Sequence, residues 1–187
     1  MKGMGVRVVW ALGLVVLGVV FFSLPSPAGA SPFGWGVFGA NVPFGSSTSL
    51  SIALGGNVTI TMTPDGSNNY KGTGSHTVTI TSTDVVGYQL FVHATSSTGM
   101  TSGSASIPAS SNSTPAVLAL NSWGYNITGS TTNFVGMLAT NTLIKDASGP
   151  FTNGDPTTVT YGAYVDPAQP AGTYSAAVTY TAVAKNQ

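Results

Sequence analysis

Alternation of apolar residues with serine and threonine runs through most of this chain, and it restricts the fold to β-sheet. The alternation is found in residues 49–54, 58–63, 77–81, 88–94, 123–127, 159–165 and 174–182. Successive side chains of a strand point to opposite faces, so this pattern predicts strands that bury one face. After residue 30, no stretch shows the spacing of an amphipathic helix. The chain is therefore predicted to be all-β.

Turn-forming residues separate the predicted strands. Glycine, proline, asparagine and aspartate gather at 55–57, 64–69 and 166–172. The first of these turns is expected to close a hairpin between residues 49–54 and residues 58–62.

Two longer stretches show weaker patterns. Residues 96–115 are expected to form a surface connection with a short edge strand near Ile107. Residues 129–154 are expected to cap one end of the core, with short strands at most. About seven to nine short strands joined by such turns predict an antiparallel β-sandwich with immunoglobulin-like, Greek-key connections.

The first 30 residues have the layout of a secretory signal peptide. Lys2 and Arg7 precede an apolar run over residues 8–22, and Ala28-Gly29-Ala30 supplies the small residues of a cleavage site. The run is expected to be a hydrophobic helix, removed after Ala30. An uncleaved membrane anchor is the alternative, since residues 8–24 approach the shortest spanning length. Either way, the protein is predicted to be exported to the cell surface.

Composition narrows the function classes. The chain has 187 residues, no cysteine and only 5% charged residues. Disulfides and cysteine-bound zinc are therefore excluded, and scattered lysines cannot form a nucleic-acid-binding surface. The expected organisation is a signal peptide over residues 1–30, an apolar segment over residues 31–46, and one β-sandwich domain over residues 47–187.

Several short strings resemble a known group of proteins. They are Asn-Ser-Trp-Gly-Tyr from Asn121, Val-Thr-Tyr-Gly-Ala from Val159, Gln-Pro-Ala-Gly-Thr-Tyr from Gln169 and Val-Thr-Tyr-Thr-Ala from Val178. Over residues 48–184 the chain resembles small secreted immunoglobulin-like β-sandwich proteins of bacterial cell surfaces, a group that brings no catalytic motif. A looser likeness, to filament subunits that polymerise by strand donation, rests on architecture and the apolar segment.

Residues 31–46 are unusually apolar for a new N-terminus. Burying them as the first strand of their own domain is one interpretation. Insertion into the next subunit as a donated strand is the other, and head-to-tail donation would give a filament. The candidate donor residues are Phe33, Trp35, Val37, Phe38, Val42 and Phe44.

The remaining chemistry-bearing residues favour structural roles. Trp123 and Tyr125 are expected in the core rather than stacked on a sugar. His76 and His93 lack the companions of a metal site, and residues 65–69 predict a turn rather than a calcium loop. No nucleophile motif is present. Asn112 is the candidate glycosylation site.

These observations predict a non-enzymatic, cell-surface structural or adhesive protein without catalytic, cofactor or metal sites. Its expected partners are further copies of itself or cell-envelope components, with no nucleic acid. Membrane contact is expected only through an uncleaved signal segment. An extracellular glycan- or ligand-binding module is the alternative.

Overall fold

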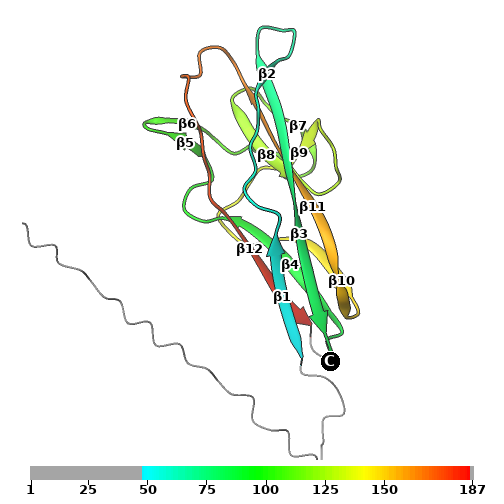
Figure 1. Ribbon diagram of the computed structural model, residues 1–187. Helices are drawn as coiled ribbons and strands as arrows, with labels where there is room; N and C mark the ends of the chain where they lie inside the picture. The colour runs from blue at the N-terminus through cyan, green and yellow to red at the C-terminus, as the bar shows by residue number, and fades with distance from the viewer. Residues whose placement is uncertain (1–47, 186–187) are drawn as a thin grey trace, which may run out of the picture. The chain divides into compact units, whose positions relative to one another are not determined.

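The computed structural model describes residues 48–185, and this part of the chain is built from twelve strands without a helix (Figure 1). No helix there has the length and apolarity needed to cross a bilayer. The predicted signal helix and the apolar segment of residues 31–46 lie outside the described residues. The strands are β1 (Ser49–Leu54), β2 (Thr63–Pro64), β3 (Tyr70–Thr83), β4 (Gly87–Ala94), β5 (Met100–Ser102), β6 (Ala105–Ile107), β7 (Ala116–Val117), β8 (Ser122–Asn126), β9 (Asn133–Phe134), β10 (Thr142–Ser148), β11 (Phe151–Val165) and β12 (Val178–Lys185).

The larger sheet has the strand order β1-β3-β11-β8, and β2 also pairs with β3. Its centre is the long antiparallel pair of β3 and β11, in continuous register from Val165 opposite Tyr70 to Asp155 opposite Ile80, with a register shift before Phe151 pairs with Ser82. The turn before β3 is the one predicted at residues 64–69. There the Asp65 carboxylate accepts hydrogen bonds from the backbone N–H groups of Ser67 and Asn69, at 2.7 and 3.1 Å.

The smaller sheet has the order β10-β4-β12, and all of its pairs are antiparallel. Two short pairs, β5 with β6 and β7 with β9, stand beside the two main sheets. The β5–β6 pair includes Ile107, where a short edge strand was expected. The predicted all-β class with antiparallel sheets is confirmed for the described residues.

The two main sheets share one apolar core. Trp123 and Tyr125 are 1% and 4% exposed, which confirms their predicted burial. Alternate residues of the central strands meet between the sheets, as the period-two pattern predicts. These include Val78, Ile80, Val159 and Tyr161 from the larger sheet, and Tyr88, Leu90 and Val92 from the smaller.

The predicted hairpin around residues 55–57 is wrong. β1 pairs with β3, and the chain does not turn back after Leu54 but continues along β3 until it pairs again in β2. Residues 55–62, the crossing segment, connect the two strands without ladder pairing. Glycine and asparagine here let the chain leave the sheet edge rather than reverse.

The expectation of an irregular cap over residues 129–154 is also wrong. β10 is an edge strand of the smaller sheet, and β11 begins at Phe151. The sequence pattern did not predict β10 or the first part of β11, because the strand register is irregular there. The register shifts between Leu143 and Lys145 in β10 and between Phe151 and Asp155 in β11. A bulge breaks the alternation from which strands are predicted. The last strand begins later than expected, at Val178.

Candidate binding groove

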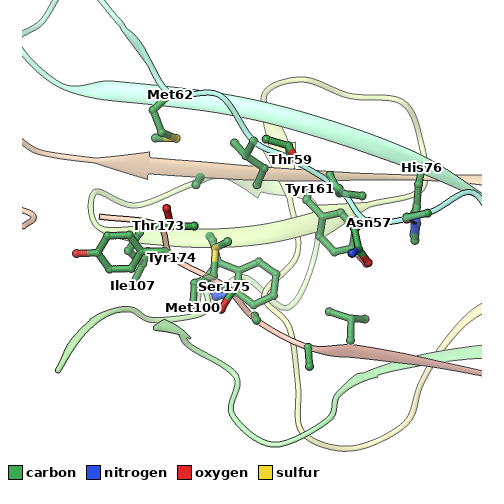
Figure 2. A pocket seen from close by; sticks show the side chains of 18 of the residues that line it. Asn57, Thr59, Met62, His76, Met100, Ile107, Tyr161, Thr173, Tyr174 and Ser175 are labelled. Atoms are coloured by element: carbon green, nitrogen blue, oxygen red, sulfur yellow. Dashed lines mark hydrogen bonds between the residues drawn. The ribbon is translucent and has the colours of Figure 1, made fainter. Parts of the chain in front are cut away.

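A cavity of about 840 Å³ opens between the crossing segment and residues 172–180, along the free side of β12. We call it the edge groove (Figure 2). Trp123, Tyr161 and Ala163 of the larger sheet line it from the core, together with Met100 and Ile107 of the β5–β6 pair.

In both walls of the edge groove, the residues that pack against the core recur at every second position. Val58, Ile60 and Met62 of the crossing segment are half-buried against the core, while the residues between them are exposed. On the opposite wall, the residues that pack towards the core have even numbers, as in a strand: Tyr174, Ala176, Val178 and Tyr180. This spacing matches the two-residue repeat of a β-strand.

Backbone pairing identifies which edge of β12 has no paired strand among residues 48–185. Ser175 exchanges two hydrogen bonds with Thr101, of 2.9 and 3.0 Å, and the carbonyl of Ala177 accepts one from the N–H of Thr95. Neighbouring residues of a strand direct their N–H and C=O groups to opposite edges. The even-numbered residues therefore direct theirs away from β4. Within residues 48–185, Tyr174 and Ala176 make no backbone–backbone hydrogen bond.

The lining of the edge groove is uncharged. None of the described residues that line it is aspartate, glutamate, lysine or arginine. An occupant with a charged side chain would have to desolvate that charge without a partner, which is costly. The groove therefore favours an uncharged, extended and apolar occupant.

A hydrogen-bonded chain of three side chains closes one end of the groove. Nδ1 of His76 lies 2.9 Å from the carbonyl oxygen of Gly56, and Nε2 lies 2.8 Å from the Tyr180 hydroxyl. Because a carbonyl can only accept, Nδ1 carries the proton of the neutral ring. Tyr180 then donates to Nε2, and Tyr161 donates to Tyr180. The chain ties the crossing segment to β3 and β12.

Burial dominates the electrostatics of the two tyrosines. It raises the pKa of Tyr161 to about 12, although the hydrogen bond with Tyr180 acts in the opposite direction. Burial, followed by the proximity of Tyr161, raises the pKa of Tyr180 well above its ordinary range. Both hydroxyls therefore stay protonated at physiological pH.

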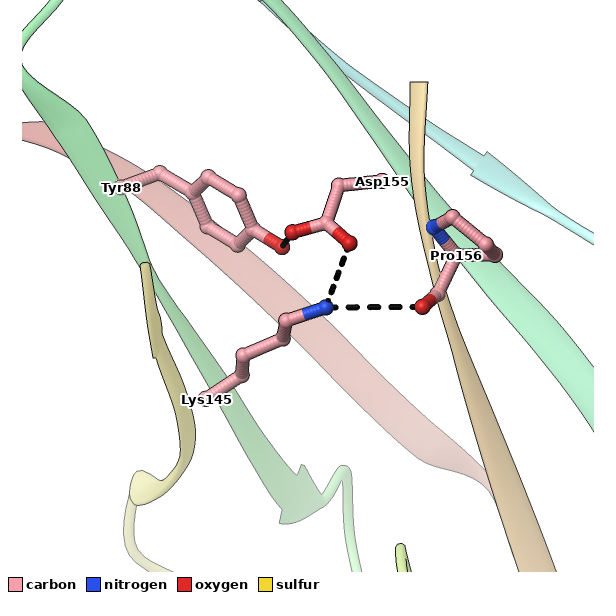
Figure 3. A network of polar contacts seen from close by, with 4 residues as sticks. All are labelled: Tyr88, Lys145, Asp155 and Pro156. Carbon is pink, nitrogen blue, oxygen red and sulfur yellow. Dashed lines mark hydrogen bonds and ion pairs between the residues drawn. The ribbon is translucent and has the colours of Figure 1, made fainter. Parts of the chain in front are cut away.

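A second polar network joins the two main sheets away from the groove (Figure 3). Nζ of Lys145 on β10 lies 2.7 Å from Oδ1 of Asp155 on β11. The hydroxyl of Tyr88 on β4 donates to Oδ2 of Asp155 at 2.7 Å. Burial raises the pKa of Asp155, but the hydrogen bonds from Lys145 and Tyr88 outweigh it, so the pKa lies below its ordinary value. The network holds the sheets together.

The other predicted site residues are spread over the fold. Nδ2 of Asn112 donates to the carbonyls of Ala116, Val117 and Phe134 at 3.0–3.1 Å, and its glycosylation stays a prediction. Among residues 48–185, no three metal-ligating side chains cluster, and Nδ1 of His93 is buried without a partner. The six candidate donor residues all lie outside the described part.

Sequence reasoning missed the groove itself. It forms from two segments more than 100 residues apart, and it exists because residues 58–62 do not pair as predicted. One signal was available: the last alternating stretch, residues 174–182, begins before β12 does. Its first residues keep their strand-like spacing although no strand in the described part of the chain pairs with them on the groove side.

Comparison with known proteins assigns no family to this chain. No protein-family model and no curated protein matches the chain. Among solved structures, the chain is similar to part of a chaperone–tip adhesin complex of CFA/I fimbriae biogenesis, at 14% identity and a TM-score of 0.42. The match covers 74% of this chain and 42% of the other, so this chain spans less than half of that protein. The functional proposal therefore rests on the groove.

Proposed function

We propose that this protein is an exported, non-enzymatic structural or adhesive subunit of the cell surface, assembled by strand donation. Its domain is an immunoglobulin-like sandwich that lacks its last strand, and a strand from another copy completes it. The observation that carries this proposal is the edge groove, where core-packing apolar residues with strand periodicity lie beside backbone groups of residues 174 and 176 that have no backbone partner within residues 48–185.

The strand order supports the immunoglobulin-like interpretation. Such a sandwich has four strands in the order A-B-E-D facing a sheet of C, F and G. Here β1-β3-β11-β8 corresponds to the first sheet, and β4 with β12 corresponds to C and F. Within residues 48–185, no strand occupies the position of G beside β12, and β10 lies on the far side of β4. The groove lies where G would pair.

The chain's own N-terminal segment fits the chemistry of the groove. Residues 31–46 contain no charged residue and alternate large and small side chains. An added strand gains affinity from main-chain hydrogen bonds and specificity from alternate side chains in pockets. Donation from one copy to the next does not close on itself, so it produces a filament. The scarcity of charge permits close packing of copies.

A binding module for a glycan or another extracellular ligand is the second candidate. Tyr161, Tyr174 and Tyr180 give the groove an aromatic lining with hydroxyl groups. Aromatic faces with a few polar groups are typical of small-ligand sites. This candidate requires a monomer whose groove is free for ligand.

The two candidates differ in assembly, which truncation can test. We expect the chain of residues 31–187 to form oligomers or fibres by size exclusion and negative-stain electron microscopy, and the chain of residues 46–187 to stay monomeric. If both are stable monomers, strand donation is refuted and glycan binding becomes the next assay.

Two substitutions in the subunit that receives the donated strand make the test specific to the groove. Ala176→Arg places a charged side chain in the groove, whereas Val183→Arg places the same side chain on the exposed face of β12, outside the groove lining. We expect only Ala176→Arg to block assembly. Mixing the Ala176→Arg chain, which keeps its donor, with the chain of residues 46–187, which keeps its groove, should restore a one-to-one complex. Equal assembly of both arginine variants would contradict the proposal.

A further inference from the structure

The crossing segment follows the edge of β3 but contains more residues than the edge requires. From Leu54, opposite Val78, to Thr63, opposite Lys71, it advances nine positions while β3 advances seven. Two residues are therefore in excess. Gly55 donates its N–H to the carbonyl of Thr77 at 2.8 Å, and beyond it the segment leaves the ladder.

The excess chain lies over the core side of β3. Gly72 and Gly74 share the even-numbered face of β3 with buried Val78 and Ile80. A Cβ atom at Gly72 would lie 2.3 Å from the carbonyl oxygen of Thr61, and one at Gly74 would lie 2.4 Å from that of Thr59. No real Cβ tolerates such distances. The segment can cross here because both positions are glycine.

Residues 57–62 of the crossing segment have apolar contacts but no backbone hydrogen-bond partner among residues 48–185. Val58, Ile60 and Met62 pack against the core. Within the described part of the chain, residues 57–62 make no backbone–backbone hydrogen bond, and Tyr174 and Ala176 across the groove also lack one. A strand paired with the free edge of β12 would make the same kind of apolar contacts and also satisfy the backbone groups of residues 174–180, each hydrogen bond adding stability.

We propose that residues 57–62 of the crossing segment form a displaceable strap that covers the groove side of the core in the isolated subunit and moves aside when a donated strand enters, while Gly55 and Gly56 stay anchored to Thr77 and His76. This inference rests on the proposed function, because it assigns a regulatory role at the same groove. Its apolar residues keep the core covered before assembly. Its unpaired backbone makes its removal easier than removal of a ladder-bound strand.

Replacement of Gly74 by alanine tests this proposal, because it should increase the rate of assembly. In Gly74→Ala the new Cβ displaces the carbonyl of Thr59 and lifts the strap, without adding charge to the groove. Gly124→Ala is the matched control, because its Cβ would lie 2.4 Å from the carbonyl oxygen of Val135, away from the groove lining. Both variants place the new Cβ 2.4 Å from a backbone carbonyl oxygen, and only one bears on the strap.

The assay is the rate of oligomer growth of the purified chain of residues 31–187, followed by light scattering. We expect Gly74→Ala to assemble about fivefold faster or more, since overpacking of this kind shifts an equilibrium by at least that factor. Gly124→Ala should not assemble faster. An unchanged or slower rate for Gly74→Ala would mean that the segment is a fixed wall, and would overturn the inference while leaving strand donation intact.

Hydrogen exchange provides a readout that does not depend on the variants. On assembly of the wild-type chain, the amides of residues 174–180 should become protected, whereas those of residues 57–62 should not. Protection of residues 57–62 would show that they pair with the donated strand, which contradicts displacement. If the wild-type chain does not assemble, the proposed function fails, and the strap with it.

Discussion

Removal of one hydroxyl group should reveal how much the cross-sheet network contributes to stability. The change is Tyr88→Phe. The ring stays in place, so its edge-to-face contact with Phe151, at 5.5 Å between centroids, is kept. The hydrogen bond to Asp155 is lost. The carboxylate then retains Lys145 as its partner.

The magnitude follows from the charge and exposure of Asp155. A hydrogen bond to a charged group contributes about 1.5–3 kcal/mol. The Asp155 side chain is 17% exposed, so water replaces part of the lost bond and the expected loss lies near the lower end, about 1.5–2 kcal/mol. With a urea slope of about 2 kcal/mol/M, the midpoint should fall by about 1 M.

The effect should also depend on pH, with a definite sign. The pKa of Asp155 is lower in the folded protein than its ordinary value, so its contribution is present above the unfolded pKa of about 3.9 and is lost as pH falls through the folded pKa. The difference between wild type and Tyr88→Phe should therefore be full at neutral pH and shrink in acid.

The assay is urea unfolding of the chain of residues 46–187, followed by circular dichroism at neutral pH and below about pH 3. Tyr70→Phe is the control, because Tyr70 is 40% exposed and its hydroxyl has no hydrogen bond to residues 48–185. If Tyr88→Phe destabilises no more than Tyr70→Phe, or by the same amount at both pH values, the reasoning is refuted.

Three further outcomes are expected. Gly162→Ala should destabilise by about 1–3 kcal/mol in urea unfolding, because its Cβ would lie 2.4–2.7 Å from three ring atoms of Phe134, and adding Phe134→Leu should recover part of the loss. Spectrophotometric titration should show that Tyr161 and Tyr180 ionise only above about pH 11, since burial raises the pKa of each; normal titration of all tyrosines would contradict this. Trp123, the sole tryptophan in residues 46–187 and 1% exposed, should resist acrylamide quenching until the protein unfolds.

Unbroken alternation predicted the fold well. It located most of β4 and β8, the second half of β11 and residues 77–81 of β3, and it placed Trp123 in the core. These strands have regular ladders, so each side chain keeps its face along the strand. The Asp65 turn was also predictable, because its chemistry is local.

Features that depend on distant partners were not predictable. β10 was missed because a bulge next to Leu143 breaks its alternation. Residues 58–62 have a strand pattern, yet their partner is decided by β3 and by Gly72 and Gly74, which allow the chain to cross. The pairing of Lys145 with Asp155 likewise depends on how β10 and β11 face each other across the core.

The geometry of β1 has a mechanical consequence for the proposed filament. A pulling force would enter the domain just before Ser49 and run along β1, which is held to β3 by six residue pairs. Ladder hydrogen bonds lie perpendicular to the strands, so this force loads all six pairs together rather than opening them one at a time. β3 then spreads the load to β11 over its much longer ladder. Tension applied along β1 would therefore meet the strongest direction of the sheet, whereas sideways peeling would separate the pairs in sequence.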